Sequence, residues 1–416
     1  MNDTLHLAVR PAHACRLFFG NIFRRGRGMG NAPQLLAFLL ALALFEVLFL
    51  AADAVAAPVR VVYGFDREFA PFTYEKPGGE PTGFEIDLVN AIFNGSDATL
   101  VFRPLQWERV PLELSSGAIT VTTSMVRTEQ RSKLYLFSEQ PTFPLQIRFF
   151  TKIYNRFPSA SLLRGQMVSV EKGTYQHRLL EEFAGVNIKT FSNRVDGLRA
   201  LYNEEVVAYC APVQNTYFYI GKLNYGAITT VGTPLGMTEM RIAVNRDRGD
   251  IKKMVDDGLE RVISSGEYDR LYRKWFVREL SDQEWDIMLA AAAKAAIPAY
   301  TPYGGNGQGA AVLAATGNVY SAASLENADF SLTLSALRAA VAKAVSEGEF
   351  ELRAAVLVDQ QGNIKPLAPE DLQTLYEFGR GILVLSEPEK GRYETSMLSR
   401  LLPTPVIRPS AVVKVE

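Results

Sequence analysis

The residues that could bind a carboxylate lie in two separate stretches of the sequence. Arg131 ends the run Thr128-Glu129-Gln130-Arg131, and its planar guanidinium can hold both oxygens of a carboxylate at once. Gly173-Thr174 stands where a strand signal gives way to a helix, so its backbone N–H groups are available to the same anion. Phe69 and Trp107 could supply apolar walls. We therefore predict a carboxylate-binding cleft, with a surface arginine and a core tryptophan as the alternatives.

The chain is poor in side chains that bind transition metals. It has two cysteines, Cys15 and Cys210, and three histidines, of which only His177 lies beyond the first 57 residues. Three soft ligands for a catalytic zinc ion cannot be drawn from one thiol and one imidazole. We therefore expect no metal and no other cofactor. Once an N-terminal segment has been removed, the single remaining thiol also leaves no internal disulfide.

The elements that must carry these residues alternate between strands and helices. The alternating run Val59 to Tyr63 predicts a strand, and Gly83 to Ile92 predicts a helix because its apolar residues recur at spacings of three and four. Met167 to Val170 predicts a second strand that runs into a helix. Because the alternation restarts near Arg164, we predict an α/β fold with two lobes over residues 58–280.

Six segments in this part of the chain resemble the periplasmic amino-acid-binding proteins of ABC importers. They are Asp66-Arg67-Glu68-Phe69-Ala70-Pro71-Phe72, Gly83-Phe84-Glu85-Ile86-Asp87-Leu88, Trp107, Thr128 to Arg131, Lys172-Gly173-Thr174, and Gly266-Glu267-Tyr268 leading to Arg273-Lys274-Trp275-Phe276. The resemblance implies a bilobed periplasmic-binding-protein fold of type II that closes on a small-molecule ligand, with an ABC importer membrane subunit as partner. It assigns ligand binding to these residues: Asp66, Phe69, Phe72, Trp107, Ser124, Arg131, Gly173 and Thr174.

Two positions depart from the pattern of that family. Val126 stands five residues before Arg131, where the family usually has a threonine, and the acid that binds the ligand's α-ammonium falls near Ala211 or Pro212. A buried ammonium without a carboxylate partner is costly, because a charge removed from water needs compensation. We therefore predict a small carboxylate, another amino-acid-like solute or a neutral one as the ligand, and not a free α-amino acid.

The C-terminal part, about Asp286 to Val406, resembles cytidine deaminase. Ser281 to Ala296 predicts a helix, and strands at 310–313 and 354–358 flank a predicted helix at 333–346. The resemblance also rests on the runs 290–303, 325–333, 343–348 and 399–403. It implies a smaller α/β three-layer domain over residues 281–408. Because such deaminases form dimers or tetramers, it also implies a homo-oligomer.

The residues that deamination requires are missing from this part. The reaction needs a zinc-bound water and a glutamate that moves protons. Ser335-Ala336-Leu337-Arg338 stands where the family places a metal ligand, an alanine and the glutamate, and Pro366 to Asp371 replaces its Pro-Cys-x-x-Cys motif. We predict that this domain is not an enzyme. Glu370 and Asp371 are then solvated acids at a helix start, with a site for a hard cation as the alternative.

The N-terminus and the charge balance indicate where the protein works. Arg24, Arg25 and Arg27 precede an apolar run from Leu35 to Ala52 and the small residues 54–57, the layout of a secretory signal. We predict a signal peptide over 1–57, a periplasmic protein, and a short tail at 409–416, with an uncleaved membrane anchor as the alternative. Lys and Arg number 44 against 45 Asp and Glu, which gives no reason to expect nucleic acid as a partner.

The leading hypothesis is thus an extracytoplasmic small-solute-binding protein, the receptor of an ABC-type importer, which works by hinge closure and carries an inactive deaminase-like domain for assembly. Two alternatives remain. One is an enzyme on the binding-protein fold, a dehydratase or hydrolase that uses an acid of raised pKa such as Asp66 or Glu85. The other is a membrane-tethered sensory domain.

Overall fold

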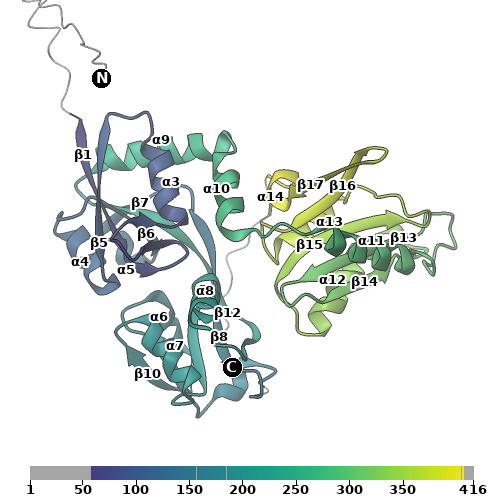
Figure 1. The fold of residues 1–416 in the computed structure, drawn as a ribbon, viewed down its shortest axis with the longest axis horizontal. Coiled ribbons are helices and arrows are strands. Elements are labelled where there is room, and N and C mark those ends of the chain that lie inside the picture. The colour runs from purple at the N-terminus through teal and green to yellow at the C-terminus, as the bar shows by residue number, and fades with distance from the viewer. Residues whose placement is uncertain (1–57, 156, 184, 404, 407–416) are drawn as a thin grey trace, which may run out of the picture. The chain divides into compact units, whose positions relative to one another are not determined.

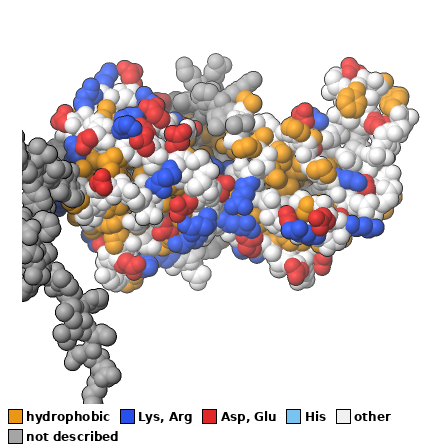
Figure 2. Space-filling model, turned by 90° about the horizontal axis from the view of Figure 1, so that it is seen from above, with side chains coloured by type: hydrophobic (Ala, Val, Ile, Leu, Met, Phe, Trp, Pro, Cys, Tyr) orange, Lys and Arg blue, Asp and Glu red, His pale blue; other side chains and the backbone are white. Residues whose placement is uncertain are grey.

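The computed structural model describes residues 58–406 apart from 156, 184 and 404. The predicted signal segment at 1–57 and the predicted tail at 409–416 lie outside the described residues. None of the helices in the described part is both long and apolar enough to cross a bilayer. Figure 2 shows Lys and Arg side chains interspersed with Asp and Glu over the visible face, in keeping with the balanced composition.

Strands between residues 59 and 245 build a sheet that belongs to two lobes. They are β1 (Val59–Asp66), β5 (Ala98–Leu105), β6 (Val121–Val126), β7 (Tyr135–Phe137), β8 (Phe143–Lys152), β9 (Met167–Glu171), β10 (Asn187–Phe191), β11 (Ala208–Pro212) and β12 (Ile228–Asn245). Within the described residues the order is β10-β9-β11-β8-β12-β6-β1-β5, with β7 also paired to β12. β5, β1 and β6 run parallel in the first lobe, and β10, β9 and β11 run parallel in the second.

Two long antiparallel strands connect the lobes. β8 pairs with β12 from Phe143 to Lys152, and the register shifts between Val231 and Gly236. Figure 1 shows β8 and β12 running from the first lobe into the second. The chain crosses between the lobes only along these strands in the described part, so they form the hinge of the predicted bilobed architecture.

Helices cover the sheet in each lobe. The first lobe carries α3 (Phe84–Phe93), α4 (Val110–Ser115), α5 (Glu129–Ser132), α9 (Gly249–Ser264), α10 (Glu267–Phe276), the short helix η1 (Trp107–Arg109) and a small sheet of β2 (Glu68–Phe69), β3 (Thr73–Glu75) and β4 (Pro81–Thr82). The second carries α6 (Tyr175–Glu182), α7 (Arg194–Tyr202), α8 (Val213–Leu223) and η2 (Ala160–Leu163).

A glycine permits the tight entry into α3. Gly83 has φ of +130°, and a Cβ there would lie 2.1 Å from the carbonyl oxygen of Phe72. Only glycine avoids both the strained backbone and the clash. The Gly-Phe pair read from the sequence therefore has a steric reason, and α3 begins at the predicted place.

The C-terminal part has its own sheet. Its strands are β13 (Gln308–Ala314), β14 (Val319–Ala323), β15 (Leu352–Asp359), β16 (Leu383–Glu389) and β17 (Arg392–Met397), in the order β14-β13-β15-β16-β17 among the described residues. Its helices are α11 (Asp282–Ala296), α12 (Ala336–Ser346), α13 (Pro369–Tyr376), α14 (Leu398–Leu401) and the short η3 (Phe330–Leu332). The strand β14 and the hairpin that it forms with β13 were not predicted.

Alternate residues of β13 face two different helices, so this part has three layers. Ala311 and Leu313 pack on the side of α11, whereas Ala310 and Val312 pack against α12. α11 crosses the sheet very closely at Gly309, where a Cβ would lie 2.1 Å from the carbonyl oxygen of Ala292. Figure 1 labels α11 and α12 beside this sheet.

Candidate functional site

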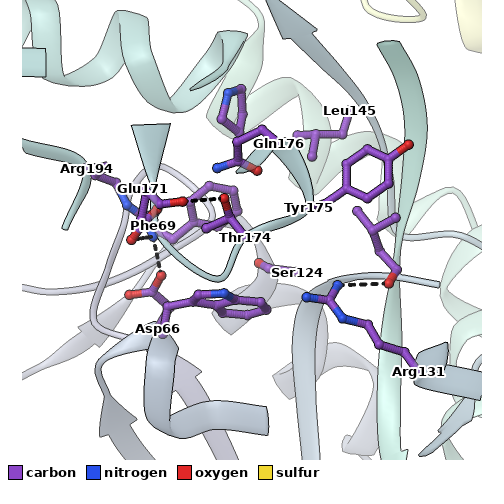
Figure 3. A pocket seen from close by; sticks show the side chains of 13 residues that line it. Asp66, Phe69, Ser124, Arg131, Leu145, Glu171, Thr174, Tyr175, Gln176 and Arg194 are labelled. Atoms are coloured by element: carbon purple, nitrogen blue, oxygen red, sulfur yellow. Dashed lines mark hydrogen bonds and ion pairs between the residues drawn. The ribbon is translucent and has the colours of Figure 1, made fainter. Parts of the chain in front are cut away.

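Two pairs of parallel strands, one pair from each lobe, end at one cavity. Asp66 ends β1, Val126 ends β6, Glu171 ends β9 and Pro212 ends β11, and all four line a cavity of about 40 Å³ (Figure 3). Carboxyl ends of parallel strands are where ligands bind in open α/β sheets. Because each lobe contributes two of these ends, the cavity depends on how the lobes close.

Hydrogen bonds between the lobes show that the cleft is closed. The Asn215 side chain, in the second lobe, donates to the carbonyl oxygen of Ala70 at 2.6 Å. The Tyr219 hydroxyl donates to the carbonyl oxygen of Glu68 at 2.6 Å. The cavity is therefore small because the lobes meet around it.

Arg131 is a partly buried cation that faces the cavity. Its Nη1 donates to the carbonyl oxygen of Val126 at 3.0 Å, and its guanidinium lies 5.7 Å from the ring centre of Trp107. Among the residues that the structure describes, no carboxylate forms an ion pair with it. Burial lowers the pKa of Arg131, and the positive charge of Arg178 lowers it further. This guanidinium has lost water without gaining an anion.

Arg194 is a second guanidinium at the cavity, and its Nη2 pairs with two acids. Its Nη2 donates to Asp66 Oδ2 at 2.5 Å and to Glu171 Oε1 at 3.1 Å, and its guanidinium lies 4.6 Å from the ring centre of Phe69. Figure 3 shows Arg194 reaching these two carboxylates, which come from opposite lobes. Arg194 is only 5% exposed. The three charged groups form a buried network between the lobes.

Burial and the neighbouring charges shift the pKa values of this network. Burial raises the pKa of Glu171, Arg194 opposes that effect and Asp66 adds to it, so that the pKa reaches about 7. Burial lowers the pKa of Arg194, but the charges of Asp66 and Glu171 outweigh this and raise it beyond its ordinary value. Arg194 stays charged at every accessible pH, whereas Glu171 titrates near neutrality.

Glu85 is a buried acid that binds Ser124, one of the residues lining the cavity. Its carboxylate accepts hydrogen bonds from the backbone N–H and hydroxyl of Ser124 and, at 3.0 Å, from the hydroxyl of Thr142. Ser124 has φ of +58°, which a serine rarely adopts, so these bonds hold it in place. Burial raises the pKa of Glu85, which is fully buried and does not line the cavity. Glu85 therefore positions Ser124 and does not face a bound solute.

The structure brings six of the eight predicted ligand-binding residues to this cavity: Asp66, Phe69, Trp107, Ser124, Arg131 and Thr174. Phe72 is not among the lining residues. It is fully buried, with its ring stacked on Phe69 and edge-on to Phe143, because the chain turns it into the core of the first lobe. Gly173 does not line the cavity either, and its N–H donates to Nδ1 of His177. Ligand contact by the six remains a prediction.

The sequence reading missed Arg194 and Glu171. A signal for each was present. Arg194 is the first residue of α7, directly after the capping Asn193, where a cation opposes the helix dipole and so needs another reason to be there. Glu171 directly follows the predicted strand Met167 to Val170 and ends β9 in the structure, and charged residues at the carboxyl ends of parallel strands face a cleft.

The two departures noted in the sequence both line the cavity. Val126 and Pro212 present apolar side chains there. Of the acids that line it, Asp66 and Glu171 both pair with Arg194. The part of the chain that the structure describes thus offers an ammonium group no unpaired carboxylate in this cavity.

In the C-terminal part, the residues at the expected metal position bind one another. The Ser335 hydroxyl caps α12 and donates to Asp371 Oδ1 at 2.6 Å, and Nε of Arg338 donates to the same hydroxyl at 3.1 Å. Arg338 also lies 3.4 Å from Asp371 Oδ1. Asp371 is 3% exposed, so the prediction of a solvated acid was wrong for this residue. The hydroxyl of Ser335 and the charge of Arg338 compensate it inside the domain.

Comparison with known proteins identifies similar proteins for each part. Residues 61–278 match the bacterial extracellular solute-binding proteins, family 3, and residues 267–367 match the cytidine and deoxycytidylate deaminase zinc-binding region. The L-cystine-binding protein TcyJ of Escherichia coli (strain K12) is 24% identical over 220 residues, covering 52% of this chain and 82% of that protein. The cytidine deaminase of Sporosarcina psychrophila is 36% identical over 118 residues, covering 28% of this chain and 86% of that protein.

A solved structure is similar to the first part in its fold. An ABC uptake transporter substrate binding protein from Streptococcus pneumoniae, with bound histidine, superposes with a TM-score of 0.50 at 18% identity, covering 54% of this chain and 94% of that one. The matches confirm the predicted type II binding-protein fold and the deaminase-like domain that follows it.

The C-terminal residues do not fit the zinc ion that the deaminase match implies. Zinc in such sites takes thiolate and imidazole ligands. Here the corresponding groups are a serine hydroxyl and one carboxylate, and the Arg338 guanidinium lies 3.4 Å from that carboxylate. A fixed cation at this distance repels a metal ion. Among the described residues, no group of three His, Cys, Asp or Glu side chains could hold one.

The raised pKa of Glu171 gives the folded protein a specific pH dependence. Glu171 binds its proton more tightly in the folded protein, with a pKa of about 7, than in the unfolded chain, with its usual 4.5. The stability that it contributes is complete below pH 4.5 and is lost as the pH rises to about 7. In Glu171→Gln this titration is absent, so the melting temperature of the first part should fall less between pH 5 and 8 than in the wild type.

Scanning calorimetry across this pH range measures the effect. Glu182→Gln is the matched control, because Glu182 is exposed on the helix that follows Glu171, and it should keep the wild-type profile. Identical profiles for the wild type and Glu171→Gln would contradict the assignment.

Proposed function

Because the chain belongs to the bacterial extracellular solute-binding proteins, family 3, over residues 61–278 and carries a cytidine deaminase-like domain behind it, we propose that its cleft binds a small carboxylate solute by hinge closure. The protein works outside the cytoplasm, and its closed form presents the solute to the membrane subunit of an ABC importer. The cleft performs no chemistry. Closure of the two lobes is the signal that the partner recognises.

One observation carries this proposal. Arg131 faces the cavity without an ion-pair partner among the described residues. Within that part of the chain, the hydrogen bond of its guanidinium goes to the carbonyl oxygen of Val126. A buried guanidinium without an anion is unfavourable, and a carboxylate that binds it in two places removes the cost. Trp107 and Phe69 supply apolar surface for the rest of a small ligand.

The same cavity disfavours a free α-amino acid. Its ammonium would need a carboxylate, and both acids that line the cavity are occupied by Arg194. At Pro212 the chain offers an apolar ring. The ligand is therefore a carboxylate without a free α-ammonium, or a neutral acceptor of similar size.

Arg131→Ala tests the proposal. In calorimetry and thermal-shift titrations against small carboxylates, amino acids and nucleosides, the wild type should bind a carboxylate, which raises the melting temperature. In Arg131→Ala the affinity should fall at least about 30-fold, because truncating one member of a buried charge pair costs about 2 kcal/mol or more.

Arg127→Ala is the control, since Arg127 is exposed four residues earlier, and it should bind like the wild type. Tight binding of a standard α-amino acid, or carboxylate binding that survives in Arg131→Ala, would contradict the proposal.

The C-terminal domain acts in assembly and has no deaminase activity. The proposal is supported by the internal pairing of Ser335, Asp371 and Arg338, and by exposed apolar side chains such as Phe330, which is 87% exposed, and Ile297, which is 73% exposed. Such side chains are suited to a contact between subunits. Light scattering on the purified protein should give the mass of a dimer or larger, and a monomeric mass would remove this part of the proposal.

An activity assay tests the catalytic part. Incubation with cytidine and added zinc should release no ammonia, and zinc should leave the melting temperature unchanged, since no soft ligands are available to bind it. Ammonia release by the wild type that is lost in Ser335→Ala would show that the domain catalyses deamination after all.

A further inference from the structure

Arg194 occupies a position that is unfavourable for an arginine unless contacts in the cleft compensate the cost. It begins α7, where the helix dipole repels a cation, and it is buried. Its Nε and Nη1 are buried and have no hydrogen-bond partner among the described residues. Unpaired buried donors are costly. The side chain is therefore held by the bonds of its Nη2 to two carboxylates and by its contact with the Phe69 ring.

Those contacts are of the kinds that recognise a guanidinium ion. Asp66 approaches from the first lobe at 2.5 Å, Glu171 approaches from the second at 3.1 Å, and the ring of Phe69 lies 4.6 Å from the guanidinium carbon. Two carboxylates and an aromatic face are the groups that bind a free cationic ligand in a protein cleft. Here a side chain of the chain itself fills that site.

The charges along the cavity then divide into two halves. In one half Arg194 pairs with both Asp66 and Glu171, and in the other Arg131 stands without an anion among the described residues. A solute that enters beside Arg131 meets an uncompensated positive charge, and no carboxylate that faces the cavity in the described structure is left for a positive one.

We infer that Arg194 is a tethered cation, which fills the cation-binding half of the cleft and thereby restricts the remaining cavity to small anions. This inference rests on the proposed function and names the residue that sets its ligand class. Removal of the Arg194 side chain uncovers a site for guanidinium-bearing solutes between Asp66, Glu171 and Phe69.

The competing explanation is that Arg194 only latches the lobes together. Both explanations expect a loss of stability when Arg194 is replaced, because two buried acids lose their partner. They differ in ligand binding. A latch leaves no binding site behind, whereas a tethered cation leaves a site that a free cation of the same shape can enter.

The test is chemical rescue of Arg194→Ala with methylguanidinium. Methylguanidinium chloride is titrated at millimolar concentrations and pH 8, with sodium chloride at equal ionic strength as the reference. The melting temperature of Arg194→Ala should rise with methylguanidinium, because a ligand that binds only the folded protein stabilises it. The dissociation constant of methylguanidinium, obtained from this rise, should be at least about tenfold lower for the variant than for the wild type.

Two further variants control the experiment. Arg199→Ala removes an exposed arginine from the same helix and should behave like the wild type. Arg194→Ala combined with Asp66→Asn should lose the rescue, because one of the two carboxylates is then neutral. Should Arg194→Ala not fold, Arg194→Gln keeps a hydrogen-bond donor for Asp66 and still leaves both acids without a cation, and the same titration applies.

The outcomes separate the two claims. No methylguanidinium binding by the folded variant overturns the inference, whatever the wild type binds. Carboxylate binding by the wild type is measured in separate titrations, so its absence would overturn the proposed function while the rescue stands on its own. Rescue that persists in the double variant would contradict the assignment of Asp66.

Discussion

A guanidinium removed from water needs an anion, and this requirement organises the cleft. Arg194 meets it within the protein, through Asp66 from one lobe and Glu171 from the other. Arg131 does not meet it among the described residues, and its carbonyl contact with Val126 leaves most of its hydrogen-bonding capacity unused. Arg194 therefore connects the two closed lobes, whereas Arg131 is available to bind an anionic solute. This difference between the two arginines follows from the residues at the strand ends. β1 and β9 end in the acids Asp66 and Glu171, whereas β6 and β11 end in Val126 and Pro212.

In the C-terminal domain it is a buried carboxylate that needs compensation. Asp371 is buried there, and the chain compensates it with the hydroxyl of Ser335 and the charge of Arg338. Burial raises the pKa of Asp371, and the serine and the arginine act in the opposite direction. In each part of the protein an arginine of the chain stands beside a buried acid. The scaffold of a deaminase is retained, and α11 and α12 still pack on opposite faces of its sheet.

Local patterns were sufficient to predict much of the fold and part of the site. The strand at Val59, the helix after Gly83 and the helix that starts near Ser281 depend on neighbouring residues alone, and the structure has all three. The pairing of Asp66 with Arg194 joins residues 128 positions apart, which no periodicity reveals. Phe72 was predicted to bind the ligand because of its place in the sequence, and the structure does not place it at the cavity. It lies three residues from the lining Phe69, but in the turn where its N–H donates to the Phe69 carbonyl oxygen its ring is buried in the core.

Nuclear magnetic resonance of the arginine side chains tests the central claim most directly. With the Nε–H resonances of Arg131 and Arg194 assigned through their alanine variants, a small carboxylate is titrated into the protein. The account predicts that the Arg131 resonance shifts and sharpens as its N–H groups gain an acceptor, while that of Arg194 stays in place. A carboxylate that binds while Arg131 is unmoved, or that displaces the Arg194 resonance, would contradict it.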